Sequence, residues 1–130
     1  MSKRYMIMVR ATAQSEAGVL PAPDEALMVE MAAFHEELAR AGVLLDAAGL
    51  RPSREGWRIG YQDGRRDATV IDGPFAETKE LIAGYTLIQV RSREEAMAWA
   101  RRFPAPFREG RCEIELRPLY EMEDFEAGKH

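Results

Sequence analysis

The sequence predicts an α+β fold of the ferredoxin-like kind, in the order βαββαβ, with one added hairpin. Three observations predict it. Two segments have the apolar spacing of amphipathic helices. Strand-like runs lie on either side of each of these segments. Between the two helical segments, an Asp-Gly pair is typical of a tight hairpin. With 130 residues the chain is expected to form one domain over residues 1–119, followed by an acidic C-terminal tail over residues 120–130 that is loosely held.

The N-terminal third predicts a strand, a loop and a helix. Residues 4–10 are apolar on both faces in the middle, which is typical of a strand covered on both sides. Residues 11–22 show no period and are expected to form a loop. The helix that follows should have Pro23 at its first position and Gly42 as its left-handed cap. Its apolar stripe recurs at spacings of four and three residues: Leu27, Met31, Phe34, Leu38 and Ala41.

The middle of the chain predicts a second strand and the added hairpin. Residues 43–50 form the strand. In the hairpin, apolar side chains alternate over residues 57–61, Asp63-Gly64 forms the turn, and the return strand covers about residues 67–71.

The C-terminal third predicts a strand, a helix and a last strand. Residues 84–90 are rich in strand-forming side chains. Ser92 and Glu95 form a capping box that should begin the second helix, and Pro104 should end it. Residues 112–116 then alternate between apolar and charged side chains, which favours a strand with one dry and one ionic face.

This arrangement leaves one face of the sheet without a cover. Two helices on one face of a four-stranded sheet would leave the other face bare, and Met6 and Met8 place apolar side chains there. A second copy of the chain, related by two-fold symmetry, is the expected partner.

Composition and motifs exclude several classes of function. A net charge of −4 argues against binding nucleic acid, and no apolar run reaches the length of a membrane span or a signal peptide. Two separated histidines and a single cysteine make no metal-ligand spacing, and the glycine motifs of dinucleotide, phosphate-loop and hydrolase sites are absent from the sequence. We therefore expect a cytoplasmic protein without a metal or cofactor.

The stretch DGPFAETKE, residues 72–80, is the candidate site. Asp72 at a strand end is a candidate general base, or it folds back onto the amides of its own turn. Glu77 is the second candidate acid or base, although charges behind a hairpin also form solvated surfaces. The candidate ligand-binding residues are Gly73, Phe75, Thr78 and Lys79, of which Lys79 would hold an anionic oxygen.

For several of these residues a structural role is the alternative. Gly73 could serve the turn alone, and Phe75 could fill the core instead of a pocket wall. His35, at the edge of the helical stripe, is expected to pack at the surface or half-buried, and Cys112 is expected to be a core residue.

DGPFAETKE and the following GYTLI resemble the signature of the DGPF group of the YCII-related proteins. Further similarities are AG at the end of the first helix, GL-RP at 49–52, EEA and WA in the second helix, and EIELRP near the end. The resemblance extends over nearly the whole chain, to about Leu119.

The resemblance implies a dimeric α/β barrel, with two ferredoxin-like sheets packed face to face and a cleft between sheet and helices. The wider superfamily includes monooxygenases, isomerases and dehalogenating enzymes that act on small, often aromatic, molecules. DGPF proteins are also commonly encoded beside extracytoplasmic-function sigma factors, which implies a regulatory or accessory role.

Two departures from the family pattern stand out. Ala83-Gly84-Tyr85 stands where the group usually has two glycines before the aromatic residue. The helix histidine that some smaller YCII proteins pair with an aspartate falls near Met31, so that pair is not carried over to His35.

Two functions remain open, and a third possibility is that DGPFAETKE mainly stabilises the dimer. One is a cofactor-free enzyme that transfers protons on a small aromatic or anionic molecule through Asp72 or Glu77. The other is a non-catalytic module that binds a small ligand or a regulatory protein. An enzyme of this kind should hold Asp72 or Glu77 inside a pocket, whereas a docking module should turn the charges of the motif outward.

Overall fold

The computed structural model describes residues 2–22 and 24–127, without the side chains of residues 67, 68, 79 and 127. Pro23, expected to open the first long helix, lies outside the described residues. The elements are β1 (Lys3–Arg10), α1 (Ala13–Glu16), α2 (Ala26–Arg40), β2 (Leu44–Gly49), the 3₁₀ turn η1 (Ser53–Glu55), β3 (Trp57–Gln62), β4 (Arg65–Asp72), the 3₁₀ turn η2 (Thr78–Glu80), β5 (Ile82–Val90), α3 (Arg93–Ala100), β6 (Ile114–Pro118) and α4 (Met122–Ala127).

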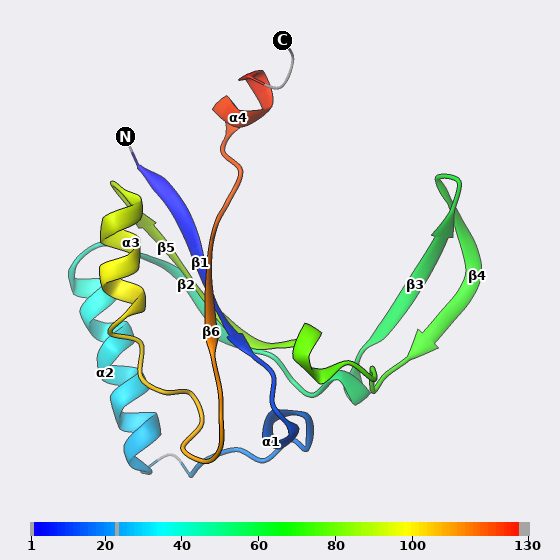
Figure 1. Ribbon diagram of the computed structural model, residues 1–130, viewed down its shortest axis with the longest axis horizontal. Coiled ribbons are helices and arrows are strands. Elements are labelled where there is room, and N and C mark those ends of the chain that lie inside the picture. The colour runs from blue at the N-terminus through cyan, green and yellow to red at the C-terminus, as the bar shows by residue number, and fades with distance from the viewer. Residues whose placement is uncertain (1, 23, 128–130) are drawn as a thin grey trace.

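The strands form two antiparallel sheets. The main sheet has four strands in the order β2-β5-β1-β6, and every neighbouring pair is antiparallel. The second sheet is the hairpin β3-β4 (Figure 1). The predicted α+β class is confirmed, and helices connect β1 to β2 and β5 to β6.

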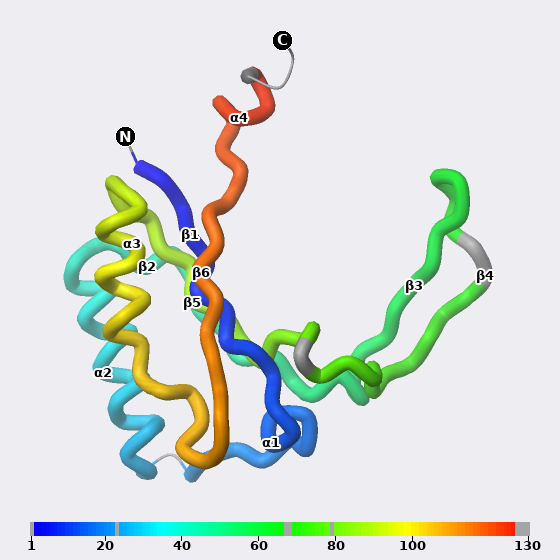
Figure 2. The backbone as a smooth tube through the Cα atoms, viewed as in Figure 1, coloured from blue at the N-terminus to red at the C-terminus, as the bar shows by residue number. Residues whose placement is uncertain are grey.

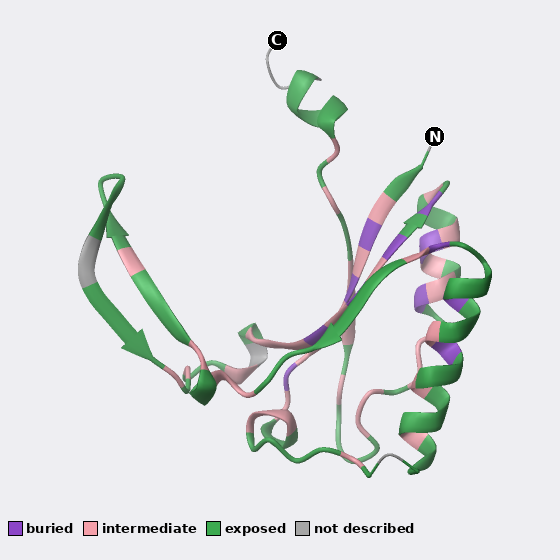
Figure 3. Cartoon of the chain, turned by 180° about the vertical axis from the view of Figure 1, so that it is seen from behind, coloured by how far each residue is buried: buried purple, intermediate pink, exposed green. Residues whose placement is uncertain are grey.

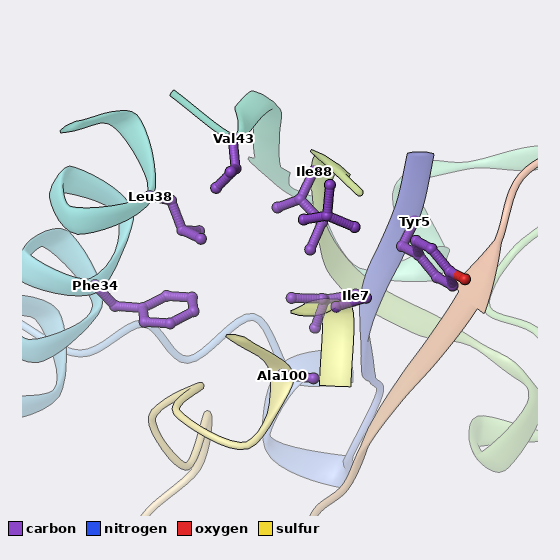
Figure 4. Close-up of a cluster of buried hydrophobic side chains, with 9 residues drawn as sticks. Tyr5, Ile7, Phe34, Leu38, Val43, Ile88 and Ala100 are labelled. Carbon is purple, nitrogen blue, oxygen red and sulfur yellow. The ribbon is translucent and has the colours of Figure 1, made fainter. Parts of the chain in front are cut away.

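The core lies between α2, α3 and one face of the main sheet. Tyr5 and Ile7 of β1 and Ile88 of β5 belong to one buried cluster with Phe34 and Leu38 of α2 (Figure 4). Ala96 and Ala100 bring α3 close to the same face. Full burial of a large apolar side chain stabilises a fold by about 1.5–3 kcal/mol, so this layer dominates the stability of the domain.

Of the four ends of α2 and α3, three lie where the capping residues in the sequence predict. Gly42 has φ +75°, the predicted left-handed conformation after α2. Ser92 accepts a hydrogen bond from the Glu95 amide at 3.1 Å, as its capping motif predicts, and the helix ends before Pro104. The start of α2 is the exception, because the helix begins at Ala26 and Glu25 makes no side-chain cap.

Two short helices were not predicted. Within the expected loop, Thr12 and Ser15 satisfy each other's backbone amides at 3.2 and 2.9 Å and thereby cap α1. Within the expected loose tail, residues 122–127 form α4. Each helix has only one or two turns, which is too short for apolar periodicity to reveal it.

The hairpin stands apart from the main sheet. Asp63 and Gly64 both have positive φ, 51° and 77°, as the Asp-Gly motif predicts for a tight turn. Figures 1 and 2 show β3 and β4 projecting away from the body of the domain, and Figure 3 shows most of the hairpin exposed. Nothing in the local sequence pattern indicates that this hairpin leaves the sheet.

The face of the main sheet opposite the helices carries an apolar centre with charges at its edge. Met6, Met8 and Leu87 are half-buried there. Arg10 and Arg117 both pair with Glu115 beside them. None of the helices that the structure describes is long and apolar enough to cross a membrane.

Candidate functional site

The two predicted acid–base residues lie at the surface. Asp72 ends β4 opposite Trp57, and its side chain is exposed. Glu77 precedes η2 and is also exposed. Both carboxylates therefore face solvent.

The Gly73–Phe75 stretch fastens the base of the hairpin to η1. The Gly73 amide donates to the Gly56 carbonyl at 2.9 Å, and the Phe75 amide donates to the Ser53 hydroxyl at 3.1 Å. The backbone at Gly73 is so close that a Cβ atom there would lie 1.7 Å from the Ser53 carbonyl oxygen. The peptide bond between Gly73 and Pro74 is cis. Gly73 is thus required by a close backbone approach.

The 3₁₀ turn η1 is itself held by the Glu16 carboxylate. Glu16, the last residue of α1, accepts from the Ser53 amide at 3.0 Å and from the Ser53 hydroxyl at 2.5 Å. The Arg54 guanidinium donates to the Glu16 carbonyl at 2.7 Å. The chain of contacts Glu16–Ser53–Phe75 therefore ties the motif to the N-terminal helix.

Phe75 and Thr78 of the motif are half-buried. The Arg58 guanidinium lies 3.7 Å from the centre of the Phe75 ring, a cation–π contact between the hairpin and the motif. Thr78 is half-buried in η2. The side chain of Lys79, the predicted anion clamp, lies outside the described part of the structure.

The cleft of the domain lies elsewhere. It has a volume of about 1020 Å³ and lies between α2, the strands β2 and β5, the segment around α1, and the loop that follows α3. None of the predicted site residues with a described side chain lines it. The roles assigned to Asp72, Gly73, Phe75, Glu77, Thr78 and Lys79 stay predictions.

His35 and Thr86 form the polar centre of this cleft. His35 Nε2 lies 2.7 Å from Thr86 Oγ1, and its Nδ1 lies 2.8 Å from the Met31 carbonyl oxygen. A carbonyl oxygen only accepts, so Nδ1 carries the proton that donates to it. In the neutral ring Nε2 is then the acceptor, and the Thr86 hydroxyl donates to it.

Aromatic rings hold the imidazole in place. The His35 ring meets Phe34 and Phe103 edge to face, with centroids 5.6 and 6.3 Å apart. Thr86 is buried, and among the described residues no buried side-chain nitrogen or oxygen lacks a hydrogen-bond partner. The orientation of the imidazole is therefore set by two hydrogen bonds and two ring contacts.

The rim of the cleft carries cations that already have partners. Arg51 pairs with Glu55, and Arg108 pairs with Glu30. Arg54 donates to the Glu16 carbonyl, as described above. Apolar side chains also line the cleft, among them Leu27, Met28, Met31, Phe103 and Phe107.

A second polar pair lies on the face of the main sheet opposite the helices, which we call the open face. The Tyr85 hydroxyl donates to Asp46 Oδ2 at 2.9 Å. This hydrogen bond, together with the negative charge of Asp46, raises the pKa of Tyr85 above its ordinary value.

Cys112 lies in a different place from the one predicted for it. Cys112, expected within the last strand as a core residue, is half-buried and precedes β6; its thiol lies 3.5 Å from the Phe107 carbonyl. Among the side chains that the structure describes, no three of the His, Cys, Asp or Glu kind form a group able to hold a metal ion.

Fold and cleft thus define an α+β domain with a histidine-containing cleft on the helical side of its sheet. The chain belongs to the YCII-related domain family, whose pattern it matches over residues 3–122. It is also 37% identical over 78 residues to the uncharacterized protein R00369 of Rhizobium meliloti (strain 1021). That alignment covers 60% of this chain and 61% of the relative.

Sequence reasoning assigned His35 to packing and did not place it in the cleft. The signal was weak, because a single histidine beside an apolar helical stripe is more often a satisfied surface residue. Thr86 is 51 residues away along the chain, and no local pattern connects the two.

Proposed function

We propose that the protein binds a small, mainly apolar molecule in the cleft and that His35 and Thr86 recognise its polar group. The fixed imidazole carries this proposal, since its two nitrogens are held by Met31 and Thr86 within the cleft. A site of this kind, largely apolar with a few oriented polar groups, is typical of small-molecule binding.

The hydrogen-bond directions favour a ligand with a hydroxyl group. The Thr86 hydroxyl uses its proton on His35 Nε2, so its oxygen lone pairs remain available as acceptors. A ligand O–H that donates to Thr86 Oγ1 would be joined to Nε2 by an unbroken chain. The ligand proton could then move to Thr86 as the Thr86 proton moves to Nε2, which leaves a ligand oxyanion and an imidazolium. This transfer needs no cofactor, and phenols fit both the chemistry and the apolar lining.

Two alternatives share the same small-molecule class. In the first, Asp72 or Glu77 transfers the proton and the ligand lies against Gly73, Phe75, Thr78 and Lys79. In the second, the protein binds its ligand without turnover, as a regulatory or accessory protein would. Binding and turnover need separate measurements, because the same cleft could serve an enzyme or a sensor.

The test is a thermal-shift screen of phenols and their methyl ethers. A ligand at a hundredfold excess over its dissociation constant stabilises the folded state by about 2.7 kcal/mol. We expect a phenol to raise the melting temperature of the wild type, Asp72→Asn and Glu77→Gln, but not of His35→Gln or Thr86→Val. The methyl ether should shift none of them.

The opposite pattern of melting-temperature shifts would assign the ligand to the DGPFAETKE motif instead of the cleft. A shift that survives in His35→Gln and Thr86→Val but disappears in Asp72→Asn or Glu77→Gln would place the ligand at the motif. Circular dichroism of each variant controls for folding. Loss or change of a bound compound on incubation then separates an enzyme from a binding protein.

We also propose a finer placement of the fold. The order β2-β5-β1-β6, with both long helices on one face, supports a ferredoxin-like arrangement. The similarity of DGPFAETKE supports membership of the DGPF group. The half-buried Met6, Met8 and Leu87 on the open face support a homodimer that closes two sheets into a dimeric α/β barrel.

A further inference from the structure

The cleft is much larger than the phenol ring that its polar centre would hold. Its volume of about 1020 Å³ lies at the upper end of the range of about 300–1,000 Å³ in which proteins enclose drug-sized ligands. An apolar cavity of about 150 Å³ is already large enough for benzene. A single ring bound at His35 and Thr86 would therefore leave most of the cleft to water.

A row of side chains on α2 shows in which direction the cleft extends from its polar centre. Met28, Met31 and His35 follow one another at spacings of three and four residues, so they lie on one face of the helix, and all three line the cleft. His35 and Met31 are half-buried, whereas Met28 is 41% exposed. With a rise of about 1.5 Å per residue the row is roughly 10 Å long, and it opens toward the N-terminal end of α2.

Exposed apolar side chains from two further segments line the same cleft. Val19 and Leu20 lie in the segment that follows α1, and Leu50 comes directly after β2. All three are exposed, Leu20 to 86%. Large apolar side chains of three separate segments thus stay uncovered at one cleft. A ligand that covers them would gain affinity from the apolar area removed from water.

The charged side chains of the cleft balance each other. Among the described residues that line it, three arginines stand beside three glutamates: Arg51, Arg54, Arg108, Glu25, Glu55 and Glu109. Each of these arginines already has a partner within the chain. Because neither sign is in excess, the lining favours an uncharged ligand over an anion or a cation.

We infer that the cleft takes an elongated, uncharged ligand with a hydroxyl group at one end and an apolar tail. The hydroxyl group lies at His35 and Thr86, and the tail extends along Met31 and Met28 to Leu20. An alkyl chain or a second ring would cover the exposed apolar side chains in this way. The inference rests on the proposed function and adds to it the length and the charge of the ligand.

The test is a series made of phenol and its para-ethyl, para-butyl and para-hexyl derivatives. Their dissociation constants are measured on the full chain by isothermal titration calorimetry. A fully buried methylene group favours binding about fourfold. Because the outer end of the cleft is open, we expect about half of that free energy, which is about twofold for each added carbon atom. The dissociation constant should therefore fall about sixtyfold from phenol to para-hexylphenol.

Two pairs of variants locate the tail. Leu20→Ser and Met28→Ser remove apolar side chains of the cleft, and each should reduce the gain from phenol to para-hexylphenol about threefold or more. Leu45→Ser and Val29→Ser are the matched controls, because these side chains are also exposed but do not line the cleft. In both controls the gain should equal that of the wild type. Circular dichroism checks that all four variants fold.

The outcomes separate this inference from the proposed function. Binding that depends on His35 and Thr86 but gains nothing from chain length overturns the elongated ligand and leaves the proposed function standing. A gain that survives in Leu20→Ser and Met28→Ser, or that falls equally in the two controls, has the same meaning. If His35→Gln changes none of the dissociation constants while the gain still depends on Leu20 and Met28, the proposed function is overturned and the apolar path is supported. A series in which no member binds overturns both.

The charge of the tail has a separate test that needs no variant. The wild type is titrated with para-hexylphenol and with two phenols whose chains of the same length end in a carboxylate or an ammonium group. Because the charges of the cleft are balanced and a charged end loses water on burial, neither should bind more tightly than para-hexylphenol. A charged end that strengthens binding overturns the uncharged tail.

Discussion

At the scale of single residues, Ser53 joins three segments that are far apart in the chain. Its amide and hydroxyl donate to Glu16, and its hydroxyl oxygen accepts from the Phe75 amide. The hydroxyl therefore both donates and accepts, which satisfies the polar groups of a half-buried turn. Together with the hydrogen bond from the Gly73 amide to the Gly56 carbonyl, this side chain holds the motif against η1.

Gly73 gives the sharpest prediction at this scale. Gly73→Ala should destabilise the fold by about 1–3 kcal/mol, because the added Cβ would overlap the Ser53 carbonyl oxygen and force the backbone to shift. Urea unfolding measures the loss. Gly56→Ala is the matched control, since a Cβ there meets its nearest neighbour at 3.6 Å and should be tolerated far better. Equal free energies of unfolding for the two variants would show that the backbone at Gly73 can shift without loss of stability.

At the scale of elements, an ionic contact between Arg4 and Glu121 fastens the base of α4 to β1. Hydrogen bonds from the side chain and amide of Arg4 hold the pKa of Glu121 below its usual range. The Asp124 carboxylate accepts from the Glu121 amide at 2.7 Å at the start of the helix. A six-residue helix would not persist alone, so the contact at its base decides where it lies.

This contact predicts a pH dependence. A carboxyl whose folded-state pKa is lowered stabilises the fold above its ordinary pKa of about 4.3, and the stabilisation is lost as the pH falls through the folded-state value. At neutral pH the wild type should therefore have a higher melting temperature than Glu121→Gln. This difference in melting temperature should shrink below about pH 4. Glu113→Gln, at an exposed position, is the control and should show no such trend. A difference that stays constant down to pH 2 would contradict the ionic explanation.

At the scale of the whole molecule, the two faces of the main sheet differ. The helical side contains the core and the cleft, whereas on the opposite side Met6, Met8 and Leu87 are no more than half-buried. That asymmetry is the physical reason to expect a second copy over the open face.

Met6→Asp tests this face. An aspartate at Met6 would be buried in the proposed interface, so we expect the dimer dissociation constant to rise at least tenfold in sedimentation experiments. Val29→Asp, on the exposed side of α2, is the matched control and should leave the constant unchanged. An unaltered dimer in Met6→Asp would rule out the open face as the interface.

The sequence by itself determined the class, most elements and the family similarity of this protein, because periodicity, capping and turn chemistry act between residues that are close in the chain. The hairpin turn and the caps at Gly42 and Ser92 are examples. The one-turn α1 and the helix α4 escaped this reasoning because they are too short to show a period. Only the tertiary structure placed Thr86 against His35 and tied Ser53 to both Glu16 and Phe75. Those contacts join residues 22 to 51 positions apart, and they exist only where packing of the whole chain brings the segments together.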